Sequence, residues 1–204
     1  MKTVDPVSHQ IRREGIVQHA LHLFATAGFA ETSMDDIAHA CKLQKASLYH
    51  YFPSKQQLLQ ELVDWGCARW AERAKDFAAE PTLQEALTKI AFTILADMDD
   101  PSRREFFKLI NYESHKNPCI FKALKESQVR NPRVVYDIFA KFLEGRFTRI
   151  EIAMLVTQFM GGIVHYASMA KLRGENMCLE SFDEASYVKH LVHLFVKGTR
   201  AGNQ

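Results

Sequence analysis

The stretch KLQKASLYHYFPSK, residues 42–55, combines a few apolar side chains with many polar ones at spacings that predict a short helix. Leu48 and Phe52 are four positions apart, so a helix places both on one face, where they can be buried. Pro53 predicts that this helix, expected over 45–51, ends there, because a residue that precedes proline avoids helical geometry. The polar side chains then project from the opposite face, toward solvent or a partner.

A second short helix is predicted just upstream, in ETSMDDIAHAC (31–41). Ser33 stands at an N-cap position and Asp36 follows three residues later, so the two residues can form a capping box. Met34 and Ile37 lie on one apolar stripe at helical spacing. A tight turn then joins this helix to the one that follows.

A first helix over 11–27 is predicted from Val17, Leu21 and Phe24, which recur at helical spacing before Gly28 ends it. The three short helices follow one another closely, and a turn of only three or four residues joins the last two. This is the arrangement of a helix-turn-helix, whose second helix can enter the major groove of DNA.

The rest of the chain is also predicted to be helical, so the expected fold class is all-α. Further helices are expected at 55–78, 82–98, 102–115, 119–143, 148–173 and 183–199, with Pro132 kinking or splitting one of them. Apolar residues make up 47% of the 204 residues and charged residues 25%, which predicts a soluble globular chain rather than a disordered one. We expect a helix-turn-helix DNA-binding domain over 1–54 and a larger helical domain over 55–204.

Charge, hydropathy and cysteines narrow the class of protein further. The net charge is +2, and residues 1–55 hold six Lys or Arg against five Asp or Glu, so any basic surface must be local. We expect no signal peptide and no membrane span, since no apolar run reaches the roughly 18 residues that a span needs. The cysteines lack paired spacing and are predicted to be reduced, mostly buried thiols of a cytoplasmic protein. They are Cys41, Cys67, Cys119 and Cys178.

The segments LHLFATAGFAETSMDDIAHAC and KASLYHYFPSKQQLL resemble the opening of the TetR family of bacterial transcriptional regulators, and the resemblance rests on residues 11–58. It implies a DNA-binding domain with a recognition helix, followed by a domain that binds a small molecule and forms a homodimer. Two positions depart from the family pattern: Lys42 stands where glycine is usual, and Gln44 where a small hydroxyl residue is usual. A left-handed lysine is costly and glutamine is a weak N-cap, so the operator preference stays open.

The predicted recognition helix carries side chains that suit DNA. Lys45 lies in its first turn and can donate to guanine acceptors or to a phosphate, while Ala46 lets the backbone approach closely. Lys55 opens the next helix, where free N–H groups and the helix dipole favour a phosphate. The predicted DNA contacts are Thr32, Ser33, Lys42, Lys45, Ala46, Ser47, Tyr49, His50 and Lys55. For Tyr49 and His50, simple solvent exposure stays open as an alternative.

The larger domain is predicted to form the dimer, because one short helix reads few bases, whereas two copies about 34 Å apart read a palindrome. The predicted interface residues, on the last two long helices, are Leu155, Phe159, Gly161, Gly162, Leu191, Val192 and Phe195. The predicted effector contacts are Trp65, Phe92, Phe106, Ile110, Asn111, Glu113, His115, Tyr136, Phe139 and Tyr166, which suit a small apolar or aromatic molecule. Packing in the chain's own core is the alternative for each apolar residue.

The expected function is that of a repressor that the effector releases from its operator. An enzyme is disfavoured, because the pairs His19/His22 and His190/His193 lack a third metal ligand at a recognisable spacing and no catalytic fingerprint appears. We therefore expect no metal and no cofactor. A DNA-binding protein of the same fold that docks a partner protein, or that activates transcription, also fits the sequence.

Overall fold

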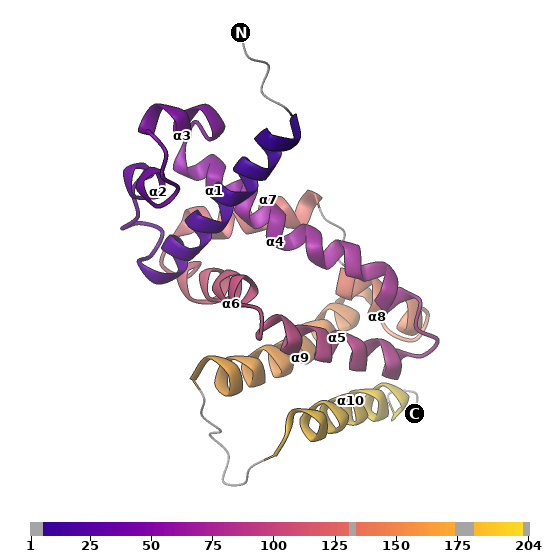
Figure 1. Ribbon diagram of the computed structural model, residues 1–204. Helices are drawn as coiled ribbons and strands as arrows, with labels where there is room; N and C mark the ends of the chain where they lie inside the picture. The colour runs from indigo at the N-terminus through magenta and orange to yellow at the C-terminus, as the bar shows by residue number, and fades with distance from the viewer. Residues whose placement is uncertain (1–5, 131–133, 174–181, 202–204) are drawn as a thin grey trace. The chain divides into compact units, whose positions relative to one another are not determined.

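The computed structural model describes residues 6–130, 134–173 and 182–201, which are helical except at the connecting turns (Figure 1). The predicted all-α fold is thus confirmed. The chain divides into two compact units, Met1–Arg69 with Pro101–Asn131, and Trp70–Asp100 with Pro132–Gln204. Helix α4 (Lys55–Ala78) begins in the first unit and ends in the second. The functional boundary expected after residue 54 stays a prediction.

The first unit joins the N-terminal helices to a group from the middle of the chain. Its elements are α1 (Pro6–Thr26), α2 (Met34–Ala40), α3 (Lys45–Tyr51), the first part of α4, α6 (Pro101–Lys108), the π-helix η1 (Leu109–Glu113) and α7 (Pro118–Arg130). The three predicted short helices are confirmed, although α1 starts at residue 6 rather than 11. Pro6 explains this early start, because the fixed φ of proline suits the first turn of a helix.

The predicted caps set the ends of these helices. Gly28 follows α1 with a left-handed backbone, φ +97°, as expected for a glycine that ends a helix. At the start of α2, the Asp36 N–H donates to the Ser33 hydroxyl, and the Ser33 N–H donates to the Asp36 carboxylate at 2.8 Å. Hydrogen bonds from the Ser33 hydroxyl and then from its N–H lower the pKa of Asp36.

The turn between α2 and α3 contains the unfavourable backbone that the sequence indicates. Lys42 has φ +53°, a left-handed conformation that costs a residue with a Cβ about 1–2 kcal/mol. Gln44 is the N-cap of α3, and its side chain makes no capping hydrogen bond. The Leu43 N–H closes the turn by donating to the Ala38 carbonyl at 2.8 Å. The turn therefore forms without either of the residues usual at these positions.

Buried apolar side chains hold the first unit together. Phe24 of α1 and Ile37 of α2 are fully buried, and so is Leu48 of α3. Phe52, just after α3, is 1% exposed. Burial of each such side chain contributes about 1.5–3 kcal/mol, so the spacing of Leu48 and Phe52 in the opening stretch fixes which face of α3 turns inward.

The second unit consists of the end of α4 and of later helices. These are α5 (Leu83–Asp97), α8 (Val134–Leu143), α9 (Arg149–Ala167), the π-helix η2 (Ser168–Arg173) and α10 (Glu184–Ala201). Helix α5 packs against α8, α9 and α10. The Phe159 ring lies 5.9 Å from that of Phe139 and 5.4 Å from that of Phe195, centroid to centroid. Helices α9 and α10 come close at Gly162, whose carbonyl accepts from the Tyr187 hydroxyl at 2.8 Å.

Three predicted helices are interrupted or continued differently in the structure. The segment 102–115 forms α6 and η1, and 148–173 forms α9 and η2. The segment 119–143 forms α7 and α8, and Pro132 lies outside the described residues between them. Hydrophobic periodicity could not predict the π-helices, because they have 5 and 6 residues and a segment of about one turn is too short to show its own apolar period.

Two further predictions need correction. The segment Arg149–Ala170 is long and apolar enough, by length and composition, to cross a membrane, whereas the sequence predicts no such run. One such helix is weak evidence for a membrane span, because an apolar helix of a globular domain can have the same length and composition. The thiols are less buried than predicted: Cys41 and Cys67 are half-buried and Cys119 is exposed, while Cys178 lies outside the described residues.

Candidate nucleic-acid interface

The candidate reading surface is the exposed face of α3 with the turn before it. It comprises Lys42, Lys45, Ala46, Ser47, Tyr49 and His50, all of them exposed. Tyr49 is 40% exposed, although tyrosine has a large apolar ring. Because Leu48 and Phe52 anchor the helix from its inner face, these side chains project outward from a fixed base. The structure thus brings together most of the predicted DNA contacts on one surface.

An acidic residue lies within this surface. The Lys45 ammonium donates to the Asp35 carboxylate of α2 at 2.9 Å, and both side chains are about 60% exposed. The hydrogen bond that Lys45 donates to Asp35, together with the negative charge of Asp35, raises the pKa of Lys45. Sequence reasoning missed this pair, because its members are ten residues apart on different helices. To contact DNA, Lys45 would have to leave or share this carboxylate.

Arg13 of α1 ties the end of α3 to α4. Its guanidinium donates to both carboxylate oxygens of Glu61, at 3.0 and 3.1 Å, and to the Tyr51 carbonyl at 2.9 Å. It also lies over the Phe52 ring, 4.2 Å from the centroid. The paired bonds between arginine and carboxylate fix the orientation of both partners. Hydrophobic spacing gives no sign of this contact, which joins residues 48 positions apart.

Besides Lys45, three more predicted DNA contacts already have partners within the protein. Thr32 is buried, 2% exposed, and its hydroxyl donates to the Gly28 carbonyl at 2.8 Å. The Ser33 hydroxyl is exposed and donates to Asp36 at 2.6 Å. The Lys55 ammonium donates to three backbone carbonyls in the loop between α1 and α2. Their contacts with DNA stay predictions, and these bonds would have to be kept or replaced on binding.

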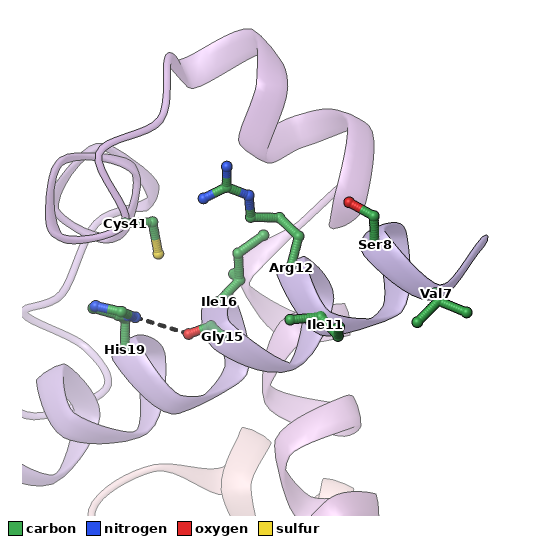
Figure 2. Close-up of a pocket in the computed structure, with 8 residues that line it drawn as sticks. All are labelled: Val7, Ser8, Ile11, Arg12, Gly15, Ile16, His19 and Cys41. Carbon is green, nitrogen blue, oxygen red and sulfur yellow. Dashed lines mark hydrogen bonds between the residues drawn. The ribbon is translucent and has the colours of Figure 1, made fainter. Parts of the chain in front are cut away.

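A cavity of about 420 Å³ lies beside the reading surface, between the outer face of α1 and the end of α2 (Figure 2). It is lined by Val7, Ser8, Ile11, Arg12, Gly15, Ile16, His19 and Cys41. Figure 2 shows the Cys41 thiol and the Ile16 side chain in the space between the two helices. Burial raises the pKa of the Cys41 thiol, although the charge of Arg12 opposes this. None of the predicted effector contacts lines this cavity.

The predicted effector contacts fall in both units. The first unit holds Trp65, Phe106, Ile110, Asn111, Glu113 and His115, and the second holds Phe92, Tyr136, Phe139 and Tyr166. The Trp65 and Phe106 rings meet edge to face with centroids 6.2 Å apart, so these two form one apolar contact between α4 and α6. Glu113 pairs with Lys116 at 3.2 Å, and Phe139 is fully buried. A shared effector pocket stays a prediction.

A second cavity of about 590 Å³ lies along α9 in the second unit. It is lined by Tyr136, Arg149, Ile150, Ala153, Met154, Thr157 and Gln158. Of these, only Tyr136 is a predicted effector contact. Ile150 is 69% exposed and Met154 58%, so this face of α9 is apolar and open.

The predicted interface residues differ in accessibility. Phe159 and Val192 are buried within the second unit, in line with the alternative of core packing. Gly162 faces α10 of its own chain, since a Cβ there would lie 3.2 Å from a Leu191 methyl carbon. Leu155, Leu191 and Phe195 are half-buried, and Gly161 is exposed. The exposed apolar residues of α9 were missed, although the i, i+4 spacing of Ile150 and Met154 was visible in the sequence.

The histidine pairs do not assemble a metal site in the described part of the chain. His22 bonds to Glu105 of α6 at 2.6 Å, and His19 bonds to the Gly15 carbonyl at 2.8 Å. No cluster of three or more His, Cys, Asp or Glu suited to a metal occurs among the described residues. The His22 contact instead links α1 to α6.

Sequence comparison finds similarity at the reading surface. Residues 16–62 match the sequence model of a family described as bacterial regulatory proteins, tetR family. The HTH-type transcriptional repressor KstR2 of Mycolicibacterium smegmatis is 35% identical over 74 residues, which make up 34% of this chain and 36% of that repressor. The match thus spans about a third of that relative's length.

Two solved structures match nearly the whole chain. FadR from Bacillus subtilis, in complex with stearoyl-CoA, aligns with a TM-score of 0.70 and 16% identity, over 91% of this chain and 98% of that one. AibR, in complex with isovaleryl coenzyme A and operator DNA, aligns with a TM-score of 0.64 and 18% identity, over 90% of this chain and 97% of that one. At such identities the likeness concerns the fold alone.

Proposed function

Because this chain belongs to the TetR family of bacterial regulatory proteins, we propose that it is a cytoplasmic transcriptional regulator, not an enzyme, and that it reads a palindromic operator as a homodimer. The observation that carries the proposal is the polar face of α3, which buried Leu48 and Phe52 hold outward. A helix presented in this way fits the major groove, which is about 12 Å wide.

The reading surface divides into base and phosphate contacts in this proposal. Lys45 and Ser47 read base edges, and Ala46 allows the α3 backbone to approach the groove. Tyr49 and His50, on the exposed side of α3, contact phosphates or bases. Phosphate contacts fix the register of the protein on DNA, whereas base contacts give the sequence preference.

Selection of binding sites from a random duplex library tests the proposal. The native protein is expected to enrich a palindrome, and the variant Lys45→Ala with Tyr49→Ala to lose that enrichment, since each good base contact contributes about 1–3 kcal/mol of discrimination. Lys125→Ala, at an exposed position of α7, is the control and is expected to select the native sequence. Failure of the native protein to enrich any sequence, even after bound ligand is stripped, would count against DNA reading.

The dimer is proposed to form through α9 and α10. The apolar, exposed face at Ile150 and Met154 supports this assignment, as does Leu194 of α10, which is 52% exposed. Contiguous exposed apolar surface on a folded chain commonly marks a protein interface. Two half-sites then lie about 34 Å apart, one turn of DNA.

The switch is proposed to be a small apolar or aromatic effector that releases the repressor from its operator. Helix α4 supports this mechanism, because it starts beside the reading surface at Lys55 and contributes to both compact units. A nearly complete change in operator occupancy requires the effector to favour one state by about 5.5 kcal/mol. Since FadR and AibR are each described with an acyl-CoA, thioesters of this kind belong in the ligand screen beside simple aromatics.

Titration of an operator complex with candidate effectors tests the switch. An effector is expected to weaken operator binding far more than threefold. If every ligand that binds the protein changed operator affinity by less than threefold, the proposed switch would be refuted. The alternative is a regulator of the same fold that acts through a partner protein or as an activator. Transcription in vitro separates repression from activation, and native mass spectrometry shows whether the purified protein carries a small molecule.

A further inference from the structure

Lys55 makes an unusual set of contacts for a residue expected to bind DNA phosphate. It is the first residue of α4, and its ammonium donates to the carbonyls of Phe29 at 2.8 Å, Ala30 at 3.3 Å and Thr32 at 2.8 Å. The ammonium also lies over the Phe29 ring, 4.5 Å from the centroid. A lysine ammonium has three N–H donors, so these three carbonyls use all of them.

The loop that receives these bonds, residues 28–33, sets the position of α2. The Phe29, Ala30 and Thr32 carbonyls lie outside any helix, and the Lys55 ammonium supplies a hydrogen-bond donor to each of them. The Thr32 N–H and hydroxyl both donate to the Gly28 carbonyl, at 3.2 and 2.8 Å, and Thr32 is buried. Ser33, the next residue, caps α2. The first turn of α4 is thereby fastened to the start of α2.

We infer that Lys55 is a positioning residue, whose ammonium fastens this loop to α4 and does not contact DNA phosphate. Contact with a phosphate would require the ammonium to leave at least one of its three carbonyls. Fastened in this way, the start of α2 follows any shift of the first turn of α4. The inference rests on the proposed function only where it concerns DNA.

Hydrogen exchange of the free protein tests the fastening without DNA. In Lys55→Met, amides of residues 29–33 are expected to exchange about tenfold faster or more, because the lost bonds were made by a charged donor. Lys55→Arg keeps the charge and is expected to show faster exchange too, since a planar guanidinium fork does not match three converging carbonyls. Unchanged exchange of this loop in both variants would overturn the inference. Native exchange of α1 and α7, which lie in the same unit as Lys55, confirms that this unit is folded in each variant.

The salt dependence of operator binding tests whether Lys55 meets phosphate. Loss of one phosphate contact lowers the slope of log affinity against log salt by about 0.9 per subunit. Lys55→Met is expected to bind the operator about tenfold more weakly, with the same salt slope as the native protein. The salt slope of the matched control Lys42→Met is expected to be smaller by about 0.9 per subunit. A slope loss of that size in Lys55→Met, or native binding by Lys55→Arg with native loop exchange, would overturn the inference. If the native protein selects no operator, the proposed function fails, and the exchange measurement still decides the role of Lys55.

Discussion

Gly66→Ala is expected to disturb the contact between α4 and α6 in the first unit. A Cβ at residue 66 would lie 2.2 Å from Cζ of Phe106, where ordinary contact begins at 3.4 Å, so the ring must retreat by about 1.2 Å (3.4 − 2.2). The ring is held edge to face against Trp65, so it cannot retreat freely. Overpacking of this kind costs about 1–3 kcal/mol.

Gly15→Ala in α1 is the matched control, because a Cβ there meets nothing within 4 Å. Both substitutions gain the helix propensity of alanine over glycine, about 1 kcal/mol, so the difference between them isolates the overpacking cost. Urea denaturation followed by tryptophan fluorescence measures both free energies of unfolding. We expect Gly66→Ala to be about 1–3 kcal/mol less stable than Gly15→Ala.

The double-mutant cycle with Phe106→Leu then identifies the cause. The shorter side chain leaves room at residue 66, so the penalty of Gly66→Ala is expected to shrink in that background by about 1 kcal/mol or more. Equal stability of Gly66→Ala and Gly15→Ala, within about 0.5 kcal/mol, would refute the reasoning. So would an undiminished penalty in the Phe106→Leu background, since the clash would then not involve the ring.

Three further outcomes are expected. Asp35→Asn is expected to strengthen operator binding several-fold in fluorescence anisotropy, because a carboxylate that holds Lys45 and repels phosphates is removed. Glu151→Gln is expected to lower the thermal midpoint at pH 7, and its difference from the native protein is expected to shrink as the pH falls below 4.5. Hydrogen bonds from the Thr148 N–H and hydroxyl lower the pKa of Glu151 in the folded protein. The stability that ionised Glu151 contributes is therefore fully present above the ordinary pKa of 4.5 and is lost as the pH falls through the lowered pKa. Ile150→Glu is expected to shift the mass in light scattering from dimer toward the 23.4 kDa monomer, because it places a charge on the exposed apolar face of α9.

Each of these outcomes has a matched control. Glu31→Gln removes an exposed carboxylate that lies outside the Lys45 pair, and an equal gain in affinity would show that only net charge matters. Glu144→Gln removes one negative charge away from the capping box of α9 and controls for the loss of charge in Glu151→Gln. If the thermal midpoint of Glu144→Gln varied with pH in the same way, the capping box would be excluded as the cause. Phe121→Glu alters an apolar residue that is 61% exposed in the first unit, and its dissociation of the dimer would place the interface elsewhere.

The sequence predicted those parts of the fold that depend on local chemistry. The capping box at Ser33, the stop at Gly28 and the end of α3 before Pro53 all follow from neighbouring residues, and the structure confirms them. The buried pair Leu48 and Phe52 follows from helical spacing alone. Such features are predictable because each of them requires only a few consecutive residues.

The contacts that shape the candidate site could not be predicted in the same way. Arg13 reaches Glu61 across 48 positions, and Lys55 reaches the loop before α2 across more than 20. These partners depend on how the helices pack, which periodicity does not specify. The predicted effector contacts were chosen by residue type, and the structure distributes them over two units. Residue type alone therefore did not predict which of these side chains are neighbours.

The most direct test of the central claim is interference footprinting on a selected operator, with chemical modification of guanine N7 in the major groove. If α3 of each subunit reads DNA, modification is expected to block binding in two successive major grooves on one face, with centres about 34 Å apart. The variant Lys45→Ala is expected to lose interference at the same guanine in both half-sites. Binding that no guanine N7 modification blocks, or a single contact without a symmetric copy, would contradict the account.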